Sequence, residues 1–164
     1  MEYATTRFLR ALSAAPEFNL ALFALLLNFP WEVLQAPLFE GMASASHSAV
    51  VGACLQATLG DAVIMLLAHA SIAAVTRRRR WVLAPSWREV AGFVAVGVAI
   101  TAVIEWLATR GHWAESWAYS SAMPVIPGIE IGLSPLFQWL IVPPIALWFV
   151  RRQSACDGAV DEQR

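Results

Sequence analysis

Three carboxylic acids interrupt long apolar stretches of this chain: Glu32, Asp61 and Glu105 each lie in a different stretch, and Gln138 lies in a fourth. A charged side chain at the centre of a bilayer costs ~2.5–3.5 kcal/mol or more, so such residues normally face a bundle interior and mark function. Hydrophobic residues make up 59% of the sequence and charged residues only 14%, whereas soluble domains carry about 25% charged residues. We therefore expect an integral membrane protein whose polar positions face inward.

Four stretches are long enough to cross a bilayer, since a spanning helix needs about 20 apolar residues. The sequence predicts an all-α fold, a four-helix transmembrane bundle in a single domain over residues 17–152. We expect a cytoplasmic amphipathic segment at 1–16, a disordered cytoplasmic tail at 153–164, and spans near 18–39, 49–75, 87–108 and 133–150.

The arginines predict the topology of the four spans. All eleven basic residues are arginine, and only Arg110 falls outside the two termini and the segment between the second and third spans. Because Lys and Arg near span ends stay in the cytoplasm, both termini are expected inside, with the 41–48 and 109–132 segments outside. The expected location is the inner membrane, as a multi-pass protein.

The polar residues follow helical spacing within each span. Asn28, Glu32 and Gln35 occupy positions i, i+4 and i+7, which share one helical face. At ~1.5 Å rise per residue, all the candidate acids fall in the outer half of the membrane. We therefore predict an outward-open pocket beneath an aromatic loop. Its catalytic candidates are Glu32, Asp61 and Glu105, and its ligand-binding candidates are Asn28, Gln35, Thr58, Trp117, Tyr119 and Gln138.

Carboxyl groups that lie close together in a low dielectric cannot all ionise cheaply, so at least one should stay protonated near neutrality. A protonated acid beside an ionised one is what proton-donor chemistry needs. The structural alternative is that Glu32 and Asp61 only hydrogen-bond Gln35, Gln138 or Asn28 and hold the bundle together. Glu105 lies shallower, where interfacial water or Arg110 is within reach.

Other features have local interpretations. The 109–132 loop is rich in aromatic residues and is either an interfacial belt or a lid. Ser86 and Glu89 have the spacing of a capping box, and His69 is expected to pack in the core. Small residues are expected to permit close helix packing, namely Gly52, Ala53, Ala57, Gly60, Gly92 and Gly97. No metal site, cofactor motif or nucleic-acid partner is predicted.

Several short motifs stand in the second half of the chain: Glu105-Trp106, Trp117-Ala118-Tyr119, Met123-Pro124, Pro127-Gly128, Ile131-Gly132-Leu133-Ser134-Pro135 and Trp139. In form this segment resembles membrane proteins of carotenoid biosynthesis, the small lycopene cyclase domains and the related hydratases. Cyclases of that group carry an acidic pair where this chain has Phe137-Gln138. The first half, with residues 28–35, resembles small bacterial inner-membrane proteins without an assigned function.

The resemblance implies an isoprenoid or other long apolar substrate that enters sideways from the bilayer. Glu32 and Asp61 would then divide proton donation and cation stabilisation, with Trp113, Trp117 and Tyr119 shielding positive charge. The leading hypothesis is an acidic pocket that binds, and chemically alters, a lipid-like or isoprenoid molecule. Two alternatives are a proton-coupled carrier acting as a homo-oligomer, and an accessory subunit docked on a membrane partner protein. Membrane lipids are expected partners in every case.

Overall fold

The computed structural model describes residues 15–113 and 116–161, with side chains described as far as residue 153. The described residues form four long helices and no β-strand, which confirms the all-α prediction. Each helix is long and apolar enough to cross a membrane. The helices are α2 (Pro16–Gln35), α3 (His47–Thr76), α4 (Trp87–Ala108) and α5 (Leu133–Asp161). The predicted segment at 1–16 lies outside the described residues up to residue 14, and α5 continues into the predicted tail.

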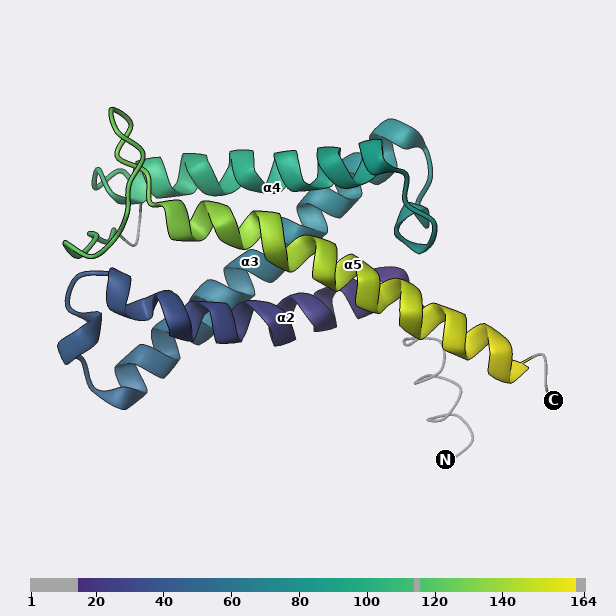
Figure 1. The fold of residues 1–164 in the computed structure, drawn as a ribbon, viewed down its shortest axis with the longest axis horizontal. Helices are drawn as coiled ribbons and strands as arrows, with labels where there is room; N and C mark the ends of the chain where they lie inside the picture. The colour runs from purple at the N-terminus through teal and green to yellow at the C-terminus, as the bar shows by residue number, and fades with distance from the viewer. Residues whose placement is uncertain (1–14, 114–115, 162–164) are drawn as a thin grey trace.

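The four helices pack as a closed ring, with α2 against α3 and α5, and α4 against α3 and α5. Figure 1 shows α2, α4 and α5 side by side, with α3 crossing behind them. The end of α2, the end of α4 and the start of α5 meet at the end of the bundle that carries the 109–132 loop. We call this the loop end, and the end that carries the α3–α4 turn the turn end.

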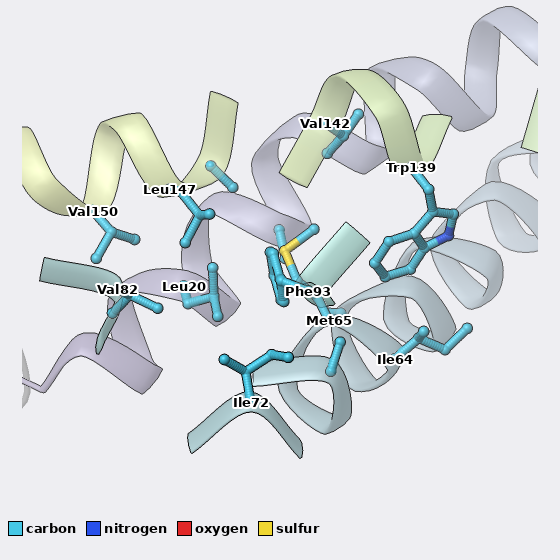
Figure 2. Close-up of a cluster of buried hydrophobic side chains, with 14 of the residues drawn as sticks. Leu20, Ile64, Met65, Ile72, Val82, Phe93, Trp139, Val142, Leu147 and Val150 are labelled. Carbon is cyan, nitrogen blue, oxygen red and sulfur yellow. The ribbon is translucent and has the colours of Figure 1, made fainter. Parts of the chain in front are cut away.

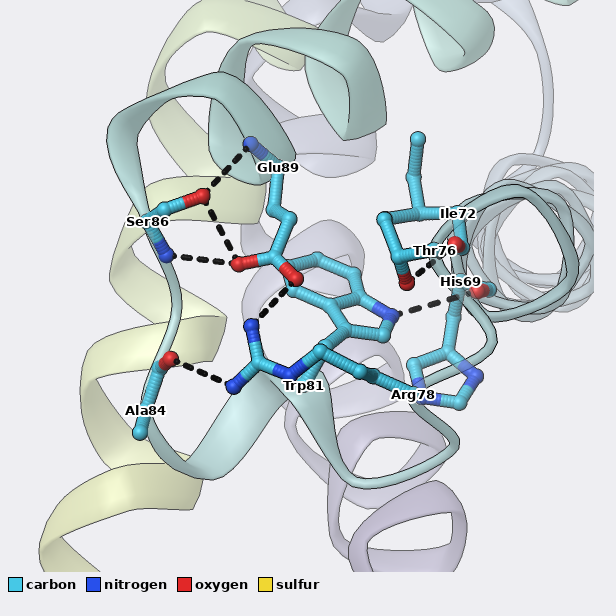
Figure 3. A network of polar contacts seen from close by, with 8 residues as sticks. All are labelled: His69, Ile72, Thr76, Arg78, Trp81, Ala84, Ser86 and Glu89. Atoms are coloured by element: carbon cyan, nitrogen blue, oxygen red, sulfur yellow. Dashed lines mark hydrogen bonds and ion pairs between the residues drawn. The ribbon is translucent and has the colours of Figure 1, made fainter.

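At the turn end, local sequence sets the boundaries of two helices. Arg77 ends α3 in the left-handed conformation at φ 55°. Ser86 begins α4 with the predicted capping box, in which the Glu89 carboxylate accepts hydrogen bonds from the Ser86 backbone N–H (2.7 Å) and hydroxyl (2.8 Å). Arg78 donates to the other Glu89 oxygen at 2.7 Å (Figure 3).

Trp81 closes the turn end from inside. Its side chain is 0% exposed, and its indole N–H donates to the backbone carbonyl of His69 at 3.3 Å (Figure 3). The His69 ring stacks on this indole at 5.7 Å between centroids. His69 is therefore a packed core histidine, as expected, and it lies at the turn end.

Replacement of Ser86 by Ala should lower the free energy of unfolding by about 1 kcal/mol, because the backbone N–H of Glu89 loses its cap. Thermal denaturation in detergent measures the change. Ser71→Ala serves as the control, since the exposed Ser71 hydroxyl only bonds the Leu67 carbonyl of its own helix. Equal melting temperatures for the two variants would contradict a stabilising role of the cap.

A cluster of buried apolar side chains fills the turn-end half and the middle of the bundle. The cluster takes side chains from all four long helices and the α3–α4 turn, and Figure 2 shows them gathered together, among them Leu20, Met65, Val82, Phe93 and Leu147. Trp139 of α5 is 2% exposed and marks the loop-side boundary of this core. The apolar core and the polar residues of the loop end therefore occupy different halves of the same bundle.

The glycines divide into two groups. A Cβ at Gly97 would lie 1.9 Å from the Trp139 ring, and one at Gly92 would lie 2.9 Å from Ile72, so both are packing contacts as predicted. The same prediction is wrong for Gly52 and Gly60, where a Cβ would meet nothing within 4 Å. Gly60 borders open space instead of a neighbouring helix.

Candidate functional site: an acidic cavity at the loop end

A cavity of about 730 Å³ opens at the loop end, and all four helices and the aromatic loop line it. This volume lies within the ~300–1,000 Å³ usual for small-molecule sites. Its polar lining includes four carboxylic acids, Glu32, Glu40, Asp61 and Glu105. Most other lining residues are small or apolar, for example Ala36, Phe39, Ala53, Ala57, Gly60, Ile64 and Ile104.

The Gln138 side chain joins three helices beside this cavity. Its amide nitrogen donates to Asp61 Oδ2 of α3 at 2.6 Å and to Asn28 Oδ1 of α2 at 2.8 Å. It also lies 3.2 Å from Glu32 Oε1. Two N–H bonds therefore serve three acceptors. The helical spacing of the sequence correctly brought these four polar residues together, and Gln138 is the donor that connects them.

Gln35 extends the network toward the loop. Its amide nitrogen donates to Glu32 Oε1 at 2.8 Å, and its carbonyl oxygen accepts from the Ser134 hydroxyl at 2.8 Å. Trp31 donates to the same oxygen at 3.2 Å. The Ser134 contact was not predicted, although its place at the start of α5 beside Pro135 is a signal for a position near the loop end.

The carboxyl groups of Glu32 and Asp61 lie next to each other, because an oxygen of each lies within hydrogen-bond distance of the same Gln138 amide nitrogen, at 3.2 and 2.6 Å. Two carboxyl groups this close in a low dielectric cannot both ionise cheaply, so the arrangement favours one proton held by the pair. Glu32 is 7% exposed, whereas Asp61 is only partly buried and borders the cavity. The pair is thus arranged as one acid and one base in contact with the cavity.

Glu105 has a different environment from the other two acids. Its Oε2 accepts hydrogen bonds from the Trp117 indole at 3.1 Å and from the Tyr119 hydroxyl. Burial, followed by the bond to the Glu105 carboxylate, raises the pKa of Tyr119, so this phenol stays protonated and keeps donating. Arg110 instead donates to the carbonyls of Trp106 and Ile129. Glu105 therefore holds the aromatic loop to α4.

The loop is also joined to the end of α2. Glu40 N–H donates to the Ala118 carbonyl, and Ser120 N–H donates to the Leu38 carbonyl, both at 2.9 Å. Phe39 packs edge-on against Trp117, with 6.4 Å between ring centroids. Because Trp113, Ser116 and Trp117 line the cavity, the loop forms one of its walls.

Replacement of Tyr119 by Phe should loosen this loop, because Glu105 loses a donor and the Gly132 N–H loses its acceptor at 3.0 Å. We expect faster amide hydrogen exchange across residues 116–132, by roughly tenfold for each ~1.4 kcal/mol lost. Ser116→Ala is the matched control, since the exposed Ser116 hydroxyl bonds only the Trp113 carbonyl. Unchanged exchange in Tyr119→Phe would show that Glu105 does not hold the loop.

Some of the other predicted site residues do not line the cavity. Thr58 is buried and donates to the Cys54 carbonyl of its own helix, and it is not among the described residues that line the cavity. Tyr119 and Asn28 are not among the described lining residues. Each is hydrogen-bonded to a residue that is, Tyr119 to Glu105 and Asn28 to Gln138. Thr101 was not predicted as a site residue, yet it lines the cavity with a buried hydroxyl that has no partner. Its i, i+4 spacing to Glu105 is a signal in the sequence that could have found it.

Searches against protein-family models, curated proteins and solved structures find no significant match to this chain.

Proposed function

We propose that this chain is an integral membrane protein of the inner membrane that binds a lipid-like or isoprenoid molecule in the loop-end cavity. Both termini would lie in the cytoplasm and the cavity would face outward, in agreement with the placement of the arginines. The observation that carries the proposal is the position of the Glu32–Asp61 pair, joined through Gln138, on a cavity with mostly apolar walls.

The same pair supports acid–base chemistry on the bound molecule. A protonated carboxyl group can donate its proton to a carbon–carbon double bond, so that its O–H bond breaks and a C–H bond forms. The resulting cation would be stabilised by the carboxylate left behind and by the aromatic faces of Trp113 and Trp117. Gln138 keeps the two acids oriented toward one another because it is bonded to both.

Exchange of Glu32 for Gln, or of Asp61 for Asn, should reduce the amount of co-purifying ligand at least tenfold, because each change removes the shared proton or its acceptor. Mass spectrometry of molecules extracted with the detergent-purified protein measures this. Glu17→Gln is the control, since Glu17 lies on α2 and pairs with Arg79 at the turn end. Wild-type ligand content in both cavity variants, with folding intact, would overturn the proposal.

One observation favours a second function, a proton-coupled carrier. The bonds of Gln138 to Asn28, Glu32 and Asp61 connect α2, α3 and α5. A change in protonation would therefore change contacts between helices, which is the coupling that a carrier needs. Proton uptake into vesicles on addition of a transported molecule would support the carrier, and proton-independent ligand retention by a monomer would contradict it.

A further inference from the structure

We propose that the ligand of the loop-end cavity is a cationic amphiphile, an apolar chain that ends in a protonated amine. This inference rests on the proposed function, because it takes the cavity as the ligand site. It adds the chemical class of the ligand's polar end, which the hydrogen-bonding groups and charges of the cavity select.

The charge of the lining favours a cation. Four carboxylic acids line the cavity, and none of the described lining residues is Arg, Lys or His. Both ion pairs among the described residues, Arg78–Glu89 and Arg79–Glu17, use arginines of the α3–α4 turn at the opposite end of the bundle. A negative potential in a cavity with apolar walls attracts positive ligands and repels anionic ones.

The hydrogen-bond inventory favours a donor-rich head group. The two N–H bonds of Gln138 are shared among oxygens of Asn28, Glu32 and Asp61, so the network has more acceptors than donors. Thr101 adds a hydroxyl that is 7% exposed, without a partner, and on the cavity wall. An ammonium group carries three donors and no acceptor. It therefore complements this lining, whereas a carboxylate or phosphate does not.

The remaining lining fits an apolar chain. Ala53, Ala57 and Gly60 of α3 and Ile104 of α4 all line the cavity, and Gly60 leaves open space where a Cβ would stand. Trp113 and Trp117 supply aromatic faces, which attract an alkylammonium ion. A hydrated inorganic cation would make no favourable contact with these apolar and aromatic side chains.

The test uses the full chain in nanodiscs and three probes with one chain length: octylamine, octanol and octanoate at pH 7. Tryptophan fluorescence titrations give a half-saturation concentration for each. We expect octylamine to half-saturate at a concentration at least tenfold below that of octanol, with octanoate weakest. Asp61→Asn should remove this preference. Thr101→Val should raise the half-saturation concentration of octylamine severalfold.

Gly60→Leu separates this inference from the proposed function. A Cβ at Gly60 meets nothing within 4 Å and Gly60 lines the cavity, so a leucine there should occupy cavity space and abolish binding of octylamine and octanol alike. Gly52→Leu, on the same helix but not among the lining residues, should change neither. One outcome refutes only the inference that the ligand ends in an amine: octanol or octanoate binds as well as octylamine, and Gly60→Leu abolishes the binding of each. The cavity then remains the ligand site. If no titration depends on Gly60, the proposed function fails as well.

Discussion

Replacement of Gly97 by Ala should lower the free energy of unfolding by about 1–2 kcal/mol. An added Cβ would lie 1.9, 2.0 and 2.6 Å from three carbons of the Trp139 ring, far inside contact distance. Trp139 is 2% exposed and belongs to the packed core, so the ring cannot move without displacing its neighbours. Overpacking of this kind costs about 1–3 kcal/mol or more, which outweighs the ~1 kcal/mol that Ala gains over Gly in a helix.

Thermal denaturation in detergent provides the measurement, and the chain contains its own controls. Gly52→Ala and Gly60→Ala make the same change where a Cβ meets nothing, so both should keep or raise the melting temperature. The double variant Gly97→Ala/Trp139→Leu should recover part of the loss, since contacting residues are not additive. The packing of α4 on α5 at this point would be disproved by a Gly97→Ala protein as stable as the two controls.

Replacement of Gln138 by Met should destabilise the bundle by about 1–3 kcal/mol. Methionine keeps the length of the side chain but removes the donor shared by Asn28, Glu32 and Asp61. Hydrogen bonds between transmembrane helices contribute about 0.6–1.7 kcal/mol each, and both N–H groups of the amide are lost together. The acceptors that remain lie on two different helices, so α2 and α3 also lose their polar link to α5.

Gln153→Met is the matched control, because Gln153 is on the same helix but lies outside the described lining of the cavity. A double-mutant cycle with Asp61→Asn isolates the Gln138–Asp61 bond. We expect a coupling energy of about 1 kcal/mol or more, given the 2.6 Å distance. Additive effects of the two changes would mean that the donor does not bridge α3 and α5.

Periodicity was sufficient to place the polar residues of each helix on one face, but not to rank them. Glu32, Asp61 and Glu105 are alike in the sequence as acids within apolar spans. In the structure, Glu32 and Asp61 share the amide nitrogen of Gln138, while Glu105 accepts hydrogen bonds from Trp117 and Tyr119 of the loop. The difference arises because the loop folds back over the end of α2 and α4, and helical spacing carries no information about that path.

The glycines show that the sequence also does not determine which small residues are helix contacts. Gly52, Gly60, Gly92 and Gly97 all lie in apolar helices, so their sequence context is equivalent. Whether a glycine is a helix contact or borders open space depends on the distance between helix axes at that level. Gly97 meets Trp139, whereas Gly60 lines the cavity.

The sequence by itself determined the helical class, the four apolar helices and the placement of the polar residues of each helix on one face, since these follow from hydropathy and the 3.6-residue repeat. Only the tertiary structure decided that Gln138 is the common donor, that Thr101 borders the cavity, and that Glu105 holds the loop. Those facts depend on the relative rotation and separation of helices distant in the chain. Packing of large side chains such as Trp139 sets both quantities, and no local pattern encodes them.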